Sequence, residues 1–360
     1  MKPRIVVAGW IGSDNLGDDL ILRSLIRRIR SVGAEPVAIS INPETTTRLH
    51  GIPAVRHRSP ADTLRMSRAL EGTTAMIFCG GLIQSETSPW NLPFHYTRVW
   101  AGRKTALGAI GLGVGRVKGL LQKSVARRMI GRMQPPVVRD HGSADRLTAW
   151  GFPEVRVGAD PVLAEPVDPV EPEDSVCVVL RPPNRRGVGT AAAKASPPSA
   201  TQAATLASCL EAVAETTGLR IRLVGFQAGR DTAVHQAIAN HLTQDVDLVT
   251  PNLDNVLNEV GRSRLVITMR YHGAVAALLY GRAAVLLDYS PKMASLAAEG
   301  GRWAPLLNPS DLQTDRLVRA CRAALEVTGR AEIARESLRS RLVENDRTLE
   351  ELITEKSTKC

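Results

Sequence analysis

The sequence of 360 residues predicts an α/β protein with two Rossmann-like βαβ domains, each built on a parallel sheet. Short apolar runs rich in β-branched residues alternate with helical patterns along most of the chain. A polar stretch rich in Pro, Glu and Asp interrupts this alternation near residue 166. The chain is also longer than one ordinary hydrophobic core supports, so we expect two domains of similar size.

The first half contains an alternating series of expected strands and helices. The strands are 4–8, 36–41, 75–78, 105–111, 136–139 and 155–157, and the helices are 19–32, 61–70, 94–101, 119–133 and 143–150. Because each strand is followed by a helix, successive strands run in the same direction and helices cover both faces of the sheet.

The second half repeats this rhythm after a stiff polar linker at 162–175. Its expected strands are 176–180, 220–225, 246–250, 265–269 and 284–288. A segment at 182–203, rich in Pro, Arg, Gly, Ala and Ser, is interpreted either as a loop that closes over substrate or as a simple insertion. A long charged helix is expected at 330–356.

These elements define an N-terminal domain at 1–165, a C-terminal domain at 166–329, and a helix with a tail at 330–360. Two βαβ domains followed by a long terminal helix describe the glycosyltransferase-B type of architecture. In that arrangement, the active cleft is expected between the domains, where small-molecule sites are common.

The composition restricts the classes of partner. The formal net charge is +10 and the pI is near 9.8, with Lys and Arg spread along the chain rather than gathered in one uninterrupted block. Aromatic residues make up only 4%, which disfavours a platform that stacks single-stranded nucleic acid, and no nucleic-acid partner is expected. The basic charge is compatible with peripheral contact with the inner face of the cell membrane.

The cysteines and apolar segments indicate a cytoplasmic protein. The five cysteines are odd in number, scattered and without C-x-x-C spacing, so neither a disulfide framework nor a zinc site is expected. The first apolar run is too short for a signal peptide, and no apolar run reaches the length of a transmembrane helix. The sequence does not indicate an oligomeric state.

One strand end carries the residues best suited to chemistry. Arg270 and His272 follow the expected strand 265–269 and precede an Ala- and Leu-rich helix. Ligands of open α/β sheets bind at such strand ends, and a helix N-terminus there favours an anion. Arginine offers a bidentate fork for carboxylate or phosphate, and histidine exchanges a proton near neutral pH. The alternative interpretation is a surface arginine and a core histidine.

Two further cations occupy comparable positions. Arg139 ends the expected strand 136–139, and Lys292 lies in the first turn of a helix that begins at Pro291. A cation at a helix N-terminus is disfavoured by the macrodipole and therefore suggests a bound anion. The alternative for Lys292 is a simple exposed lysine.

Two glycine-containing turns are candidates for the acceptor side of the cleft. The first follows strand 4–8, and the second is a loop expected after strand 75–78. Glycine permits tight turns and close approach of the backbone to a ligand, and the polar side chains can bond sugar hydroxyls. The first turn lacks the G-x-G-x-x-G spacing of a dinucleotide site, and the alternative for it is a capped βα turn. The candidate residues are Gly12, Asp14, Asn15, Gly17, Asp18, Gly80, Gly81, Gln84, Thr87 and Ser88.

Taken in order, these motifs resemble the polysaccharide pyruvyl transferase family, whose members place a pyruvate ketal on glycans of the cell envelope. The resemblance extends from Val7 to about Leu296. It is carried by the segments 12–18, 80–84, 111–115, Arg139-Asp140 with Ser143, Arg270-Tyr271-His272 and Tyr289-Ser290-Pro291-Lys292. The sequence departs from the family at Cys79, Asp19 and Tyr271, where glycine, glutamate and leucine are common.

The resemblance implies phosphoenolpyruvate as donor, bound in one pocket by three cations. Arg139 and Arg270 would hold its carboxylate and phosphate, and Lys292 would neutralise the leaving phosphate. His272, expected to be exposed to the cleft, would act as general acid and base, with Arg270 as the second catalytic residue. The partner would be a sugar acceptor that is lipid-linked, nucleotide-linked or polymeric. Phosphoenolpyruvate would serve as a co-substrate, with no cofactor and no metal.

Two other functions compete with this interpretation. A glycosyltransferase with a nucleotide-sugar donor would also place Arg and Lys near a diphosphate, but it would release a nucleoside diphosphate instead of phosphate. A basic glycan- or nucleic-acid-binding protein would bind polyanions in a salt-dependent manner without turnover.

Overall fold

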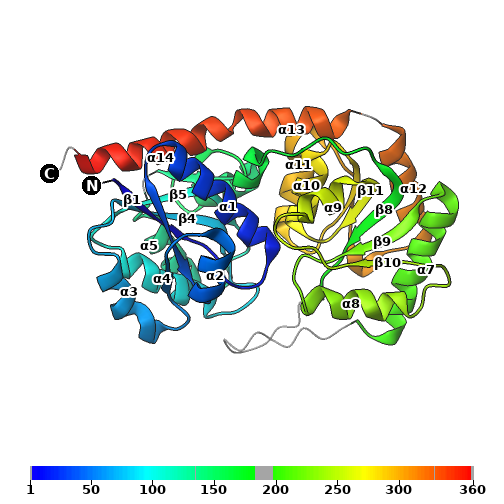
Figure 1. Cartoon of the computed structure of the whole chain (residues 1–360), viewed down its shortest axis with the longest axis horizontal. Coiled ribbons are helices and arrows are strands. Elements are labelled where there is room, and N and C mark those ends of the chain that lie inside the picture. The colour runs from blue at the N-terminus through cyan, green and yellow to red at the C-terminus, as the bar shows by residue number, and fades with distance from the viewer. Residues whose placement is uncertain (1, 134, 183–197, 328, 358–360) are drawn as a thin grey trace. The chain divides into compact units, whose positions relative to one another are not determined.

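The computed structural model describes residues 2–133, 135–182, 198–327 and 329–357. Most of the expected loop at 182–203 therefore lies outside the described residues. The described chain divides into two compact units (Figure 1). Unit 1 contains the chain up to Glu165 together with the C-terminal segment from Arg339, and unit 2 contains the chain from Pro166 to Leu338.

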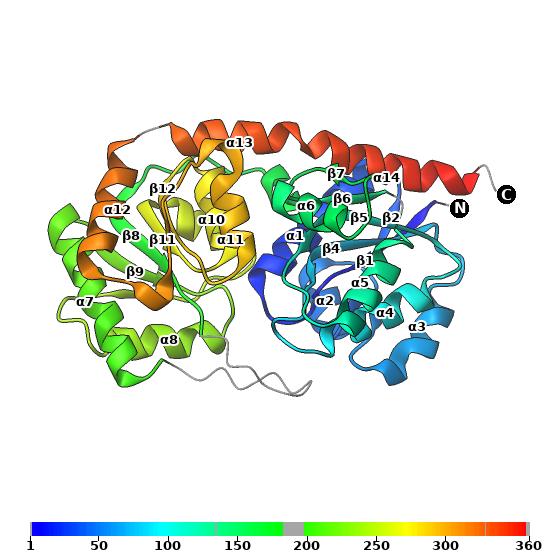
Figure 2. The ribbon, with the colours of Figure 1, turned by 180° about the vertical axis from the view of Figure 1, so that it is seen from behind.

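Unit 1 is built on a seven-stranded parallel sheet with the strand order β3-β2-β1-β4-β5-β6-β7. The strands are β1 Arg4–Ala8, β2 Glu35–Ser40, β3 Ala54–Arg56, β4 Ala75–Ile83, β5 Ala106–Val114, β6 Pro136–Val138 and β7 Arg156–Val157. The helices are α1 Leu16–Ser31, α2 Pro43–His50, α3 Thr63–Ala69, α4 Asn91–Ala101, α5 Leu120–Ile130, α6 His141–Ala149 and α14 Leu342–Ser357. Figure 2 shows this sheet from the other side.

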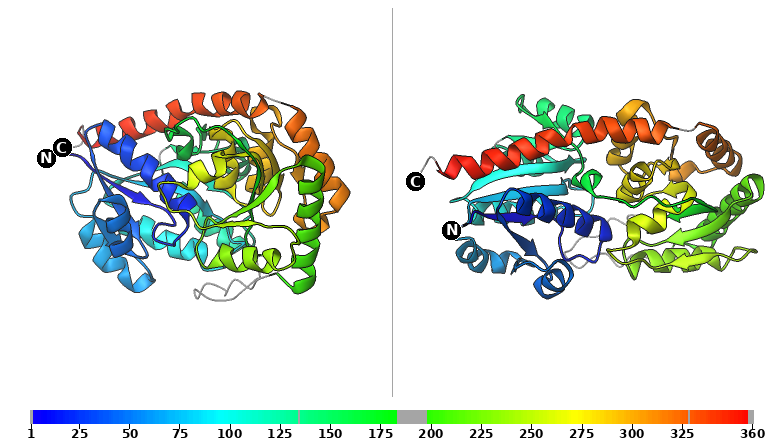
Figure 3. Two further views of the ribbon diagram at one scale, coloured as in Figure 1. Left: turned by 45° about the vertical axis from the view of Figure 1, so that its right-hand side comes forward. Right: turned by 45° about the horizontal axis from the view of Figure 1, so that its top comes forward.

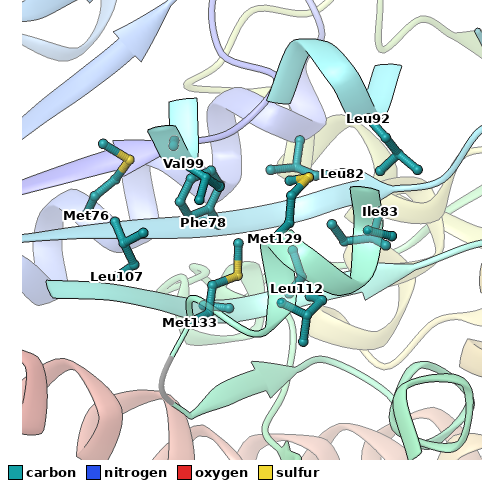
Figure 4. Close-up of a cluster of buried hydrophobic side chains, with 14 of the residues drawn as sticks. Met76, Phe78, Leu82, Ile83, Leu92, Val99, Leu107, Leu112, Met129 and Met133 are labelled. Atoms are coloured by element: carbon teal, nitrogen blue, oxygen red, sulfur yellow. The ribbon is translucent and has the colours of Figure 1, made fainter. Parts of the chain in front are cut away.

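The core of unit 1 lies around the two longest strands, β4 and β5. Phe78 and Met76 of β4 pack with Leu112 of β5 and Met129 of α5, and all four side chains are fully buried (Figure 4). On another part of β5, Gly108 lies against Leu352 of α14, the red helix that packs against β5 and β6 (Figure 3). Apolar burial on both faces of the sheet therefore fixes the strands whose ends carry the polar motifs.

Unit 2 is built on a six-stranded parallel sheet with the order β10-β9-β8-β11-β12-β13. The strands are β8 Glu173–Val179, β9 Arg220–Val224, β10 Asp247–Val249, β11 Ser263–Thr268, β12 Ala283–Leu287 and β13 Leu306–Leu307. The helices are α7 Ala200–Thr217, α8 Arg230–Ala239, α9 Val256–Gly261, α10 Tyr271–Leu279, α11 Pro291–Ala298, α12 Thr314–Glu326 and α13 Arg330–Ser340. The strand order reverses between β8 and β11, and such a switch point is where open α/β sheets bind ligands.

The structure confirms the expected fold class of two parallel α/β domains, but it corrects several elements. Strands β3 and β13 and helix α2, which are short or weakly apolar, are absent from the predicted elements. The strand predicted at 75–78 is longer, since β4 continues to Ile83. The single helix expected at 330–356 is two helices, α13 and α14, separated at Arg341. Within the described residues, every helix is too short or too polar to cross a bilayer.

The Phe78→Ala variant should lower the free energy of unfolding of unit 1 by about 3–5 kcal/mol, because it leaves a cavity in a close-packed core. Four of the five tryptophans, at positions 10, 90, 100 and 150, lie in unit 1, so urea unfolding followed by tryptophan fluorescence reports mainly on this unit. Leu64→Ala is the control, because Leu64 is 66% exposed and its truncation should change stability by less than about 0.5 kcal/mol. Equal effects of the two variants would contradict the assignment of this core.

Candidate anion-binding site

Four cationic side chains lie just beyond the carboxyl ends of neighbouring strands in unit 2. Arg181 follows β8, Arg230 begins α8 after β9, Arg270 follows β11, and Lys292 lies in the first turn of α11 after β12. Since these four strands are adjacent in the sheet, their carboxyl ends share one edge. We call these four residues the cation set.

Arg270 is held in place from both its backbone and its side chain. Its backbone N–H donates to the Thr268 hydroxyl at 2.9 Å, and that hydroxyl donates to the Arg270 carbonyl at 2.9 Å. Its guanidinium forms an ion pair with Asp231 and donates to Gln227 at 3.3 Å. The Nε atom is buried and has no hydrogen-bond partner in the described part of the chain. One donor of this guanidinium is therefore still available.

Asp231 is a structural carboxylate with its own anchoring. It is 0% exposed, and its second oxygen accepts hydrogen bonds from the backbone N–H groups of Phe226 at 2.9 Å and Gln227 at 3.0 Å. These bonds fix the turn between β9 and α8, and they also hold the carboxylate against Arg270. Asp231 thus positions Arg270 from a neighbouring strand end.

Tyr289 lies close to two members of the cation set. The Cζ atom of Arg181 is 4.6 Å from the centre of the Tyr289 ring, and Nζ of Lys292 is 5.2 Å from it. Burial alone would raise the pKa of the phenol. The charges of Lys292, Arg181 and Arg270 outweigh burial and lower the pKa of Tyr289 to about 7.

The members of the cation set repel one another. Burial lowers the pKa of the Arg230 guanidinium, and the charges of Arg181 and Arg270 lower it further, whereas Asp231 opposes this shift. Three of the cations also sit where helices begin: Arg230 is the first residue of α8, Arg270 caps α10, and Lys292 is the second residue of α11. A helix N-terminus carries partial positive charge and stabilises anions, so this placement favours an anionic ligand.

His272 and His235 are the two histidines at this edge. His272 lies in the first turn of α10, and its ring meets that of Tyr271 edge-on at 5.4 Å. The expectation that His272 is an exposed residue is wrong, because the helix packs into the sheet and leaves the residue 9% exposed. Burial lowers the pKa of His235 on α8 to about 4, so this imidazole is neutral at physiological pH.

The turn after β1 in unit 1 is organised by local hydrogen bonds. Gly12 has φ +77°, and a Cβ there would lie 2.3 Å from the Ser40 hydroxyl, so this position requires glycine. Asn15 caps α1 by accepting from Gly17 N–H at 3.3 Å, and its amide donates to Asp18. Asp14, which precedes this cap, adopts a left-handed φ of 55°. The turn is capped as the alternative interpretation expected.

The second glycine motif was expected to form a loop after strand 75–78, and this expectation is wrong. Gly80 and Gly81 lie within β4, where the register to β5 shifts at Gly80. Gly80 has φ +74°, and a Cβ there would lie 3.7 Å from Asp18 Oδ1. The bulge therefore brings the two glycine motifs together at the carboxyl edge of this sheet.

The polar residues that follow β4 bond mainly to one another. The Gln84 amide donates to the Thr87 hydroxyl at 2.7 Å, and its carbonyl oxygen accepts from Glu86 N–H at 2.7 Å. The Ser88 hydroxyl accepts from Trp90 N–H at 3.1 Å at the start of α4. These contacts shape a compact turn beside Gly80 and Gly81. Their role in holding the acceptor stays a prediction.

Arg139 lies in unit 1, whereas Arg270 and Lys292 lie in unit 2. Its side chain is buried, forms an ion pair with Asp160 at 3.0 Å and approaches Asp140 at 3.7 Å. A Cβ at Gly113 would lie 2.9 Å from this guanidinium, which explains the glycine in β5. Two carboxylates, Asp160 and Asp140, therefore lie beside Arg139, and its assignment to the donor stays a prediction.

Of this cluster, Arg270 and Lys292 are predicted from the sequence, whereas Arg181, Arg230 and Tyr289 are not. Arg181 and Arg230 follow correctly predicted strands, so the strand-end criterion, applied to every strand, also selects them. In the described ranges, no three His, Cys, Asp or Glu side chains are grouped as ligands for a metal ion.

The family assignment follows from the sequence comparison. The model of the family described as polysaccharide pyruvyl transferase matches residues 15–291. The chain belongs to this family. The matched region includes Gly80 and Gly81 of unit 1 and the strand ends that carry Arg181, Arg230 and Arg270, whereas Gly12, Asp14 and Lys292 lie just outside it. A search of the curated proteins finds no match to the sequence.

Solved structures similar to this family member share its fold at low sequence identity. The S. aureus MnaA–UDP co-structure has a TM-score of 0.65 and 11% identity, covering 98% of each chain. UDP-GlcNAc 2-epimerase from Neisseria meningitidis bound to UDP-GlcNAc has a TM-score of 0.63 and 14% identity, covering 100% of each chain. A glycosyltransferase from Rickettsia africae has a TM-score of 0.57 and 11% identity, covering 99% of this chain and 97% of the other. These neighbours are of the glycosyltransferase-B type.

The cation set predicts a tyrosine that ionises near neutral pH. Absorbance near 295 nm should show a tyrosinate with a midpoint near pH 7. Tyr289→Phe should remove this transition, and Lys292→Met should move it upward because a neighbouring positive charge is lost. The pKa of Tyr289 in the folded protein lies below its value near 10 in the unfolded chain. Ionisation of Tyr289 therefore stabilises the fold fully above pH 10, and this contribution is lost as the pH falls through 7.

Tyr280→Phe is the matched control for this titration. Burial raises the pKa of Tyr280, so the variant should keep the transition near pH 7. Absence of any tyrosinate between pH 6 and 8 in the wild type would contradict the electrostatic description of the cation set.

Proposed function

We propose that this chain transfers a pyruvyl group from phosphoenolpyruvate to a sugar of a cell-envelope polysaccharide or glycolipid, forming a pyruvate ketal and releasing phosphate. The observation that carries the proposal is the cation set, in which three of four cations occupy helix N-termini. Family membership restricts the reaction class, and the cation set supports a small donor with two anionic groups.

The chemistry of the donor matches the chemistry of the cation set. Phosphoenolpyruvate carries its carboxylate and its phosphate on the same carbon, C2. Binding both anionic groups therefore needs several cations within a few ångströms of one another. Arg270 has a free Nε donor beside its ion pair with Asp231, and arginine binds carboxylate and phosphate in bidentate geometry. Lys292 would neutralise the departing phosphate as a compact point charge.

The reaction proceeds through two additions at one carbon. A proton adds to the terminal CH₂ carbon of the donor, which becomes the methyl group, and C2 acquires oxocarbenium character. One sugar hydroxyl adds to C2 and loses its proton, and the C2–O bond to phosphate then breaks. The second hydroxyl adds to C2 and loses its proton, closing the ketal. Of the two protons that the hydroxyls lose, one replaces the proton added to the methyl group, and the other leaves with the phosphate.

His272 is the proposed group that moves these protons. Imidazole both donates and accepts protons near neutral pH, and His272 stands two residues after Arg270 in the first turn of α10. The acceptor sugar is proposed to bind residues of unit 1 near Gly80, Gln84 and Asp18. A carboxylate such as Asp18 is suited to orient sugar hydroxyls.

A second donor is favoured by one observation. Among the solved structures that share this fold, three are complexes with UDP or UDP-GlcNAc. A nucleotide-sugar donor would also place its diphosphate on arginines, and the enzyme would then be a glycosyltransferase. The released product separates the two functions.

The test is to incubate the purified protein with phosphoenolpyruvate and a panel of free, polymeric and lipid-linked hexose and hexosamine acceptors. Phosphorus NMR should show inorganic phosphate formed from the donor only when the acceptor is present. Mass spectrometry should show the acceptor with an added pyruvate ketal. Release of a nucleoside diphosphate from a nucleotide sugar, with phosphoenolpyruvate unchanged, would refute the pyruvyl donor.

His272→Gln should lower kcat at least about 100-fold, because glutamine retains the size of the side chain but cannot exchange a proton. Arg270→Lys should lower kcat/KM about 10- to 100-fold, because a lysine cannot replace the bidentate fork. His241→Ala is the control, since His241 is an exposed histidine of the same unit. Near-full turnover by either of the first two variants, with intact folding by circular dichroism, would overturn these roles.

A further inference from the structure

The net positive charge of the chain comes from one segment of unit 1. Residues 87–139 contain ten Lys or Arg residues and no Asp or Glu. The whole chain has 46 basic and 36 acidic residues, so the remaining residues carry 36 of each. The net charge of +10 is therefore confined to this segment, although the cations do not form an uninterrupted block.

Most of these cations are exposed. Arg98 and Arg139 are buried, whereas the other eight, between Arg103 and Arg132, face solvent. Glu86 lies 3.9 Å from Arg116, and no acidic side chain in the described part of the chain pairs with the others. The positive charge of this surface is thus left for a ligand or a counterion.

Helix α5 combines these charges with exposed aliphatic residues. Leu120 is 87% exposed and Leu121 is 70% exposed, at the start of the helix. The spacing of three, four and seven residues places Lys123, Arg127 and Arg128 on the same outer face. The inner face, with Ala126, Met129 and Ile130, is buried in the core. We define the α5 patch as Lys118, Leu120, Leu121, Lys123, Arg127 and Arg128.

The α5 patch adjoins the turn that carries the candidate acceptor residues. Ser85 N–H donates to the Arg116 carbonyl at 3.0 Å, and Lys118 N–H donates to the Ser85 hydroxyl at 2.8 Å. The Gln122 amide donates to the Pro89 carbonyl at 2.7 Å, next to Trp90, which is 57% exposed. Helices α4 and α5 pack side by side on this part of unit 1 (Figure 2).

We propose that the α5 patch docks unit 1 on an anionic lipid bilayer. Basic side chains next to exposed leucine and tryptophan match the two regions of a bilayer surface, because the cations meet the anionic headgroups and the apolar side chains enter the acyl boundary. A soluble polyanion would satisfy the cations but would leave Leu120 and Leu121 in water. The exposed leucine pair therefore favours the membrane.

Docking here holds the acceptor turn at the lipid surface, where a lipid-linked sugar presents its glycan. The binding itself needs neither donor nor acceptor, so it is tested independently of the proposed reaction.

The test is cosedimentation of the full chain with vesicles of phosphatidylcholine alone or with added phosphatidylglycerol, at low and high salt. The wild type should bind only the anionic vesicles, and binding should weaken with salt. Reversing two charges in Arg127→Glu/Arg128→Glu should weaken binding on the order of 25-fold or more, since each basic residue near the surface contributes about fivefold. Leu120→Ser/Leu121→Ser should weaken it about tenfold or more.

Matched controls separate the α5 patch from general charge and hydrophobicity. Arg319→Glu/Arg322→Glu makes the same charge change on the exposed face of α12 in unit 2, and Leu64→Ser/Val343→Ser removes exposed apolar residues elsewhere in unit 1. Both controls should keep at least half of the wild-type affinity. Absence of binding to anionic vesicles at low salt, or full binding by both patch variants, would overturn the proposal.

A heparin column provides the remaining arm. Membrane docking would be refuted in favour of a soluble polyanion by two results together. Vesicle binding would depend on Arg127 and Arg128 but be unchanged in the Leu120→Ser/Leu121→Ser variant, and the protein would be strongly retained on heparin.

Discussion

The concentration of like charges at one sheet edge is the physical constraint on which this account of function depends. The parallel register of β9, β8, β11 and β12 places four cations together, and the N-terminal ends of three helices add partial positive charge to the same place. Asp231 compensates Arg270, and the low pKa of Tyr289 reports the excess of positive charge. Such an arrangement is stable when an anion with several oxygen atoms binds it.

Unit 1 uses similar residues in a different way. Its buried Arg139 is matched by Asp160 and Asp140, and Asp19 lies 3.3 Å from His50. Buried Arg98 instead donates to the Gly9 carbonyl at 2.6 Å and to His57 at 3.1 Å. Most of the excess positive charge of this unit is on the outside, around α5. The two units therefore combine a charged ligand site at strand ends with a charged outer surface, and only the first is required for the proposed chemistry.

The sequence was sufficient to predict the fold class, because β-branched strands and helical periodicity alternate regularly and the polar linker separates two such series. Arg270 and Lys292 were predictable because strand ends and helix starts are visible in the sequence. The extension of β4 through Gly80 to Ile83 was not predictable, since consecutive glycines usually end a strand and only pairing with β5 retains them in the sheet. Arg181 also follows a predicted strand, but its contact with the Tyr289 ring beside Lys292 depends on the strand order of the sheet, which local patterns do not specify.

A crystal structure of the protein with bound phosphoenolpyruvate tests the central claim most directly. The account predicts that the carboxylate and phosphate oxygens lie within hydrogen-bond distance of Arg270 and Lys292, with Arg181 and Arg230 around the same anion. A crystal structure in which the donor contacts only residues of unit 1, and no donor lies at the cation set, would contradict it.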